Sequence, residues 1–117
     1  MSAEPRLQVR FYRTAAAGSE PVREWLKGLP PEERKIIGDD LKTAQYGWPL
    51  GMPLIRKLEP GLWEVRSRLG ERIARVIVTV EDDTMVLLHG FIKKSQKTQP
   101  QDLQLARQRL RALREVP

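Results

Sequence analysis

The chain has 117 residues, the length of one average domain, and 40% of them are hydrophobic, which is enough for one modest core. It contains no cysteine, which excludes a disulfide framework, a thiolate metal site and a cysteine nucleophile, and its one histidine cannot make a zinc site alone. The formal net charge is +6, and a basic chain attracts polyanions, with nucleic acid as the first class to consider.

Nothing in the sequence indicates a membrane or export. The N-terminal letters MSAEPRLQVRFYR are charged and lack the apolar segment of a signal peptide. No apolar run approaches the roughly 18 residues of a membrane span. The absence of cysteine fits a reducing compartment. We therefore expect a cytoplasmic protein with a single domain over residues 1–117. We expect no metal and no cofactor, because the sequence has neither a P-loop nor a GxGxxG motif.

The first half of the chain predicts one strand and two helices. Apolar and polar residues alternate over residues 7–13, as in a half-buried strand. A helix is expected to start at Pro21 and end near Leu29, because apolar residues recur there at helical spacing. A second helix should begin at Pro31 and end near Gly47. The two helices resemble an αα-hairpin.

The second half predicts an antiparallel meander and a last helix. A weak strand is expected over residues 55–61, followed by strands over residues 62–69, 72–80 and 84–92, with tight turns between them. In the last helix, Thr98 and Gln101 match the capping-box pattern and Pro100 falls in the first turn. The fold class is therefore α+β, with an N-terminal strand, a two-helix hairpin, an antiparallel meander and a C-terminal helix. We expect the helices to pack on one face of the sheet.

Alternation along the three later strands separates two faces. The apolar face should meet the helices, and it holds Trp63, Val65, Ser67, Leu69, Ala74, Val76, Val78, Val80, Val86, Leu88, Gly90 and Ile92. The other face collects Arg66, Arg68, Arg75, His89, Phe91 and Lys93, with Lys94 and Lys97 at its rim. A face of cations with one ring and one imidazole suits a phosphate backbone with unstacked bases.

Two interpretations of this basic face stay open. Arginines on the exposed side of a half-buried sheet often serve only solubility. The apolar residues Ile73, Ile77, Met85 and Leu87 fall on the same face, which favours a cleft or a binding partner. The arginines of the last helix lie mostly off its apolar stripe, so we expect them to be solvated. They are Arg107, Arg109, Arg111 and Arg114.

Several segments of the chain resemble the HigB-like, phage-derived branch of the RelE/ParE toxin superfamily. They are GLWEVR, LLHGFIKKSQKTQP and DLQLARQRL in the second half, and FYR and PVREWL in the first half. The resemblance covers most of the chain. It implies a RelE-like fold and a type II toxin–antitoxin system, with a helix-turn-helix antitoxin as partner. RelE-type members cleave mRNA, usually on the ribosome and without a metal, whereas ParE-type members act on DNA gyrase. HigB-like members belong with the ribonucleases, so we expect an mRNA endoribonuclease.

Metal-free RNA cleavage uses the 2′-hydroxyl of the substrate as nucleophile and needs a base, an acid and cations. We expect a catalytic set of Arg66, Arg75, His89, Lys93 and Lys94, and an RNA-binding set of Arg68, Phe91 and Lys97. Each role has its own alternative. His89 could instead hydrogen-bond a backbone carbonyl, and a lysine is the competing general base. Phe91 is either a base-stacking residue or a residue of the core. Many superfamily members carry a tyrosine or an acid near the carboxyl end. After Lys94 this chain has no tyrosine, and its only acids are Asp102 and Glu115. A non-catalytic binding module and a gyrase-directed toxin remain the alternatives.

Overall fold

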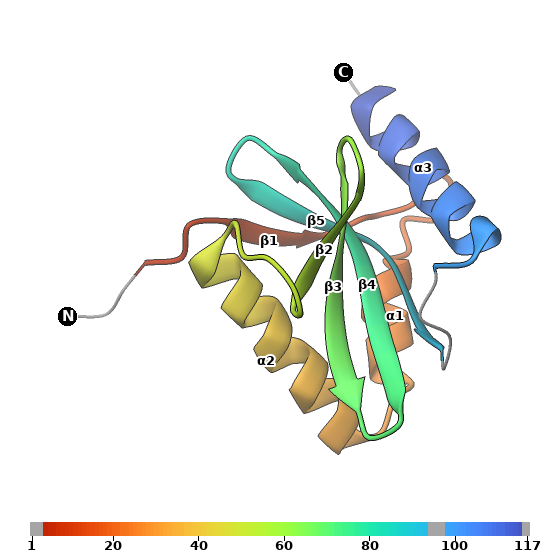
Figure 1. Ribbon diagram of the computed structural model, residues 1–117. Coiled ribbons are helices and arrows are strands. Elements are labelled where there is room, and N and C mark those ends of the chain that lie inside the picture. The colour runs from red at the N-terminus through yellow and green to blue at the C-terminus, as the bar shows by residue number, and fades with distance from the viewer. Residues whose placement is uncertain (1–3, 94–97, 116–117) are drawn as a thin grey trace.

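The computed structural model describes residues 4–93 and 98–115, which form five strands and three helices (Figure 1). Their order is β1 (Gln8–Phe11), α1 (Pro21–Lys27), α2 (Pro31–Gly47), β2 (Ile55–Glu59), β3 (Leu62–Leu69), β4 (Arg72–Glu81), β5 (Thr84–Lys93) and α3 (Pro100–Glu115). The α+β class and the predicted order of the elements are confirmed. Of the described helices, none combines the length and apolar character that a membrane crossing requires.

The strands form one mixed sheet in the order β1-β5-β4-β3-β2. The meander from β2 to β5 is antiparallel, as the short turns predicted. β1 instead joins the far edge and pairs in parallel with β5, from Gln8 opposite Thr84 to Phe11 opposite Leu87. Sequence alternation within β1 carries no information about this distant partner, so the mixed character of the sheet was not predicted.

The prediction that the helices pack on one face of the sheet is wrong. Two hydrophobic cores lie on opposite faces of the sheet. The first core lies under α1 and α2 and includes Val22, Ile37, Leu41, Ala44, Val65, Val76, Val78, Met85 and Leu87. The second core lies under α3 and consists of Leu62, Ile77, Val86, Leu88, Phe91, Ala106 and Leu110. The sheet is therefore covered from both sides, and α3 shares its face with the cations predicted for a site.

A shift in strand register explains which residues of β5 lie on which face. Ile77 pairs with His89 and Val78 pairs with Leu87, so Leu88 is an extra residue in β5. Such a bulge reverses the alternation beyond it. Val86 and Leu88 consequently pack under α3 and not with Gly90 and Ile92, as the alternation had predicted. Met85 and Leu87, predicted for the basic face, lie in the first core.

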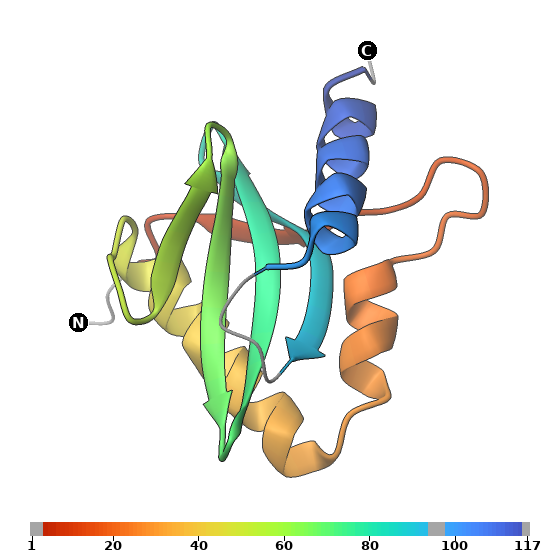
Figure 2. The same cartoon turned by 45° about the vertical axis from the view of Figure 1, so that its right-hand side comes forward.

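Glycine is needed at position 90 because α1 lies directly on the strand there. A Cβ atom built on Gly90 would come within 2.3 Å of the ring of Trp25. Figure 2 shows α1 beside the carboxyl end of β5. The glycine after the histidine thus allows close packing on one face while His89 points to the other.

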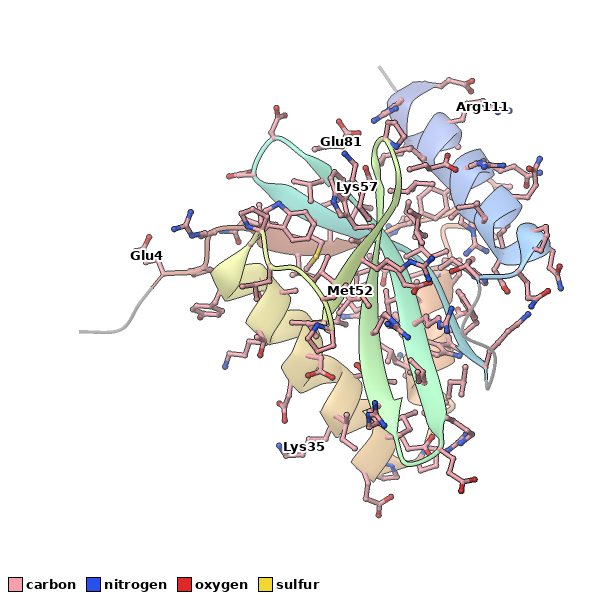
Figure 3. All side chains as sticks on the ribbon, in the orientation of Figure 1. Glu4, Lys35, Met52, Lys57, Glu81 and Arg111 are labelled. Carbon is pink, nitrogen blue, oxygen red and sulfur yellow. The ribbon has the colours of Figure 1, made fainter. Side chains whose placement is uncertain are left out.

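Arg109 of α3 holds the bulge from the second face. Its guanidinium donates a hydrogen bond of 2.7 Å to the carbonyl oxygen of Leu88 and lies 5.8 Å from the ring centre of Tyr12. Burial lowers the pKa of Arg109. The prediction of a solvated side chain is wrong for this residue. Arg107 pairs with Glu59 and Arg114 with Glu81. Arg111 is exposed and points outward from α3 (Figure 3).

Replacing Arg109 by Ala should destabilise the protein by about 1–3 kcal/mol, because the carbonyl of the buried Leu88 loses its hydrogen-bond donor. The matched control is Arg111→Ala on the same helix, whose effect should stay within about 0.5 kcal/mol. Urea unfolding of both variants measures the difference. Equal stability of the two variants would show that the bulge does not depend on Arg109.

Candidate functional site

Strand register places all six residues of the predicted basic face on the α3 side of the sheet. Three cross-strand rows run over β3, β4 and β5: Glu64–Ile77–His89, Arg66–Arg75–Phe91 and Arg68–Ile73–Lys93. We call Arg66, Arg68, Arg75, His89, Phe91 and Lys93 the basic face. Lys94 and Lys97, predicted for its rim, lie outside the described residues. Arg56 of β2 pairs with Glu64 and adds an exposed cation to this side, which the sequence interpretation missed.

A buried carboxylate, Glu64, lies among the cations of the basic face. Its side chain has no exposed area, and its Oε1 lies 3.8 Å from Arg66 Nε and 3.8 Å from Arg75 Nη1. The hydroxyl of Thr98 donates a hydrogen bond of 2.6 Å to Oε2. Glu64 is two positions before Arg66 in β3 and therefore falls on the same face, but nothing in the sequence indicated that it binds two arginines.

Thr98 has a different role from the one its sequence pattern predicted. α3 begins at Pro100, and the carbonyl of Gln99 accepts the first hydrogen bonds of the helix, from Asp102 and Leu103. Gln99 therefore occupies the capping position, and the hydroxyl of Thr98 binds Glu64 instead. This bond ties the start of α3 to β3.

The two arginines around Glu64 differ in accessibility. The side chain of Arg75 is completely buried, whereas 12% of the Arg66 side chain is exposed. Burial lowers the pKa of the Arg75 guanidinium, the Glu64 carboxylate raises it, and the neighbouring Arg66 and Arg56 lower it. Arg66 thus presents charge to solvent, whereas Arg75 lies beneath the surface and pairs with the same carboxylate oxygen.

His89 forms a second polar cluster with the first turn of α3. Its Nε2 lies 2.8 Å from Asp102 Oδ1, and Lys93 Nζ lies 3.2 Å from Asp102 Oδ2. The exposed fractions are 16% for the His89 side chain and 12% for Asp102. The partner of His89 is therefore the carboxylate of Asp102 and not a backbone carbonyl, which was the alternative prediction. Asp102 was named from the sequence as one of the two acidic residues after Lys94, but its contact with His89 was not predicted.

Phe91 lies beneath this cluster. Its ring stacks on His89 with centroids 5.2 Å apart and an angle of 24° between the planes. Only 8% of Phe91 is exposed, and it packs in the second core. It therefore has little free surface for an RNA base, and the interpretation of Phe91 as a core residue describes its position better.

A pocket of about 390 Å³ adjoins the exposed side of Arg66. Its lining consists of Asp40, Pro53, Leu54, Arg66, Arg68 and Ile73. Met52 lies beside it, with its sulfur 3.9 Å from Arg66 Nη1. No group of three or more His, Cys, Asp or Glu side chains suited to a metal ion occurs in the described part of the chain. The side chains of the site carry guanidinium, ammonium, imidazole and carboxylate groups.

Replacing Glu64 by Gln should destabilise the protein by about 3–5 kcal/mol, because the charges of Arg66 and Arg75 lose their buried counter-ion. Glu71→Gln, at the exposed turn between β3 and β4, is the matched control and should change stability by less than about 0.5 kcal/mol. The free energy of unfolding in urea measures both. A Glu64→Gln variant as stable as the control would contradict a requirement for this charge.

Comparison with known proteins identifies the family. A family profile described as "Phage derived protein Gp49-like (DUF891)" matches residues 24–111, which include α2 through β5 and most of α3. No curated protein matches the chain. The match covers well over half of the chain and contains every residue described above for the basic face, together with Glu64 and Asp102. The chain therefore belongs to the Gp49-like family of phage-derived proteins, part of the RelE/ParE-like toxin superfamily.

Proposed function

We propose that this protein is the toxin of a type II toxin–antitoxin system and that it cleaves mRNA on the ribosome without a metal, as HigB-like toxins do. The superfamily supports a toxin. The single observation that supports RNA cleavage is that Arg66 lies on the same face of the sheet as the His89–Asp102–Lys93 cluster, with only β4 between their strands. A helix-turn-helix antitoxin is the partner that this proposal requires.

His89 is the proposed general base. Because Asp102 accepts a hydrogen bond from Nε2–H, the proton of the neutral ring sits on Nε2 and Nδ1 keeps its lone pair. No residue in the described ranges bonds to Nδ1. Nδ1 is thus the ring nitrogen that takes the proton from the 2′-hydroxyl. Asp102 then stabilises the imidazolium that forms, and the stacked Phe91 fixes the plane of the ring.

The cations of the basic face complete the proposed reaction. The 2′-oxygen attacks phosphorus, a 2′,3′-cyclic phosphate forms, and the 5′-oxygen leaves with a proton from the ammonium of Lys93. Arg66 binds the phosphoryl oxygens, since a guanidinium matches phosphate in a bidentate geometry. Buried Glu64 acts as a positioning residue that holds Arg66, and buried Arg75 is the second cation that pairs with the same carboxylate. The exposed Arg68 binds the RNA, and Lys94 and Lys97 remain proposed contacts.

Two substitutions test this assignment on translating ribosomes. His89→Ala should lower the cleavage rate about 10²–10⁴-fold, because the general base is removed. Arg66→Ala should lower it about 10²–10³-fold, because charge stabilisation in the transition state is lost. Primer extension on the mRNA measures the rates. Arg111→Ala is the control, because it removes an exposed cation nine residues along α3 from Asp102, about 13 Å away.

The same assay separates the alternatives. Cleavage should occur within translated codons and stop when translation is blocked. Full activity of both variants would refute the site. Intact mRNA together with inhibited DNA supercoiling would identify a gyrase-directed toxin. RNA binding by the wild-type protein without cleavage would identify a binding module.

A further inference from the structure

The pocket beside Arg66 contains two charged side chains, Asp40 and Arg68, that take no part in the proposed cleavage step. It lies where β3 becomes an edge of the sheet, because β2 pairs with β3 only as far as Val65. Beyond that point α2 contributes Asp40 and the segment before β2 contributes Pro53 and Leu54. The volume of about 390 Å³ falls within the range of about 300–1,000 Å³ that small-molecule pockets occupy.

Opposite charges line this pocket without pairing. Asp40 is half-buried, yet its carboxylate takes part in no hydrogen bond or ion pair with any residue in 4–93 or 98–115. The guanidinium of Arg68 likewise has no partner among these residues. The pocket thus offers a hydrogen-bond acceptor from α2 and donors from β3, with apolar surface from Pro53, Leu54 and Ile73.

The polar edge of guanine matches this arrangement. Guanine carries two parallel N–H donors, at N1 and N2, which fit one carboxylate, and two acceptors, O6 and N7, which arginine binds in a bidentate geometry. Adenine and cytosine present an amino group without the second parallel donor. Uracil presents one N–H between two carbonyls. The flat faces of a base suit the apolar walls.

We propose that this pocket receives a guanine base of the RNA substrate next to the phosphate bound by Arg66, and that Asp40 is the specificity-determining residue. The inference rests on the proposed function, because Arg66 places the pocket beside the scissile phosphate. Asp40 binds N1–H and N2–H, and Arg68 binds the O6 and N7 edge.

Substitution of Asp40 tests the inference through the cleavage pattern. Wild-type protein acting on an mRNA library with randomised codons should cut with guanine enriched at one fixed position relative to the break. Asp40→Asn should reduce that enrichment about 10- to 100-fold, while cleavage at other bases persists. Asp39→Asn is the matched control, because Asp39 is exposed and pairs with Lys35 on α2. It should retain the wild-type pattern.

A binding measurement keeps this inference distinct from the catalytic proposal. Guanosine 3′-monophosphate and adenosine 3′-monophosphate are titrated against each protein by NMR. The guanine nucleotide should bind at least about tenfold more tightly to wild type and Asp39→Asn, and equally to Asp40→Asn. Unchanged guanine enrichment in Asp40→Asn would overturn the inference and leave the cleavage proposal intact. Selective binding without any cleavage would retain the pocket and overturn the catalytic proposal. No base preference in either assay would overturn the pocket assignment.

Discussion

The carboxylate of Glu64, buried between the guanidinium groups of Arg66 and Arg75, is the interaction on which this site depends. Two cations at the middle of a sheet repel each other and lose hydration, so they need a buried anion close by. Glu64 supplies it, and Thr98 adds the hydrogen bond that fixes the second carboxylate oxygen. Arg66 can consequently present its charge at the surface in a defined position.

The same face of the sheet both packs α3 and carries the site. The extra residue at Leu88 lets Val86 and Leu88 pack in the second core while His89, Phe91 and Lys93 stay on that face. Arg109 secures the bulge from α3. The first turn of that helix brings Asp102 to His89 and Lys93. The packing of α3 against β5 therefore also orients the imidazole ring of His89.

The sequence predicted those features that depend on local patterns. Prolines and apolar spacing predicted the start of both early helices, and tight turns predicted the antiparallel meander. Period-two alternation correctly placed Arg66 and Arg75 on one face of the sheet, because no irregularity interrupts that part of β3 and β4. It failed in β5, where a bulge leaves no local sequence signal.

Contacts between segments far apart in the chain could not be predicted from local sequence patterns. Three features depend on contacts between segments far apart in the chain. They are the parallel pairing of β1 with β5, the position of α3 on the opposite face of the sheet, and the side-chain partners of Glu64 and Asp102. Asp40 was missed for the same reason, because α2 and β3 meet only in the folded protein. Sequence resemblance indicated the superfamily, whereas assignment of the base and its orienting acid required the contacts of His89.

The most direct test of the proposed mechanism is a crystal structure with a short RNA that carries a 2′-deoxy sugar at the cleavage site. The account predicts the scissile phosphate in hydrogen-bond contact with Arg66, and the modified sugar facing Nδ1 of His89. RNA bound away from the basic face, or a 2′ position turned away from His89 with the phosphate on another cation, would contradict it.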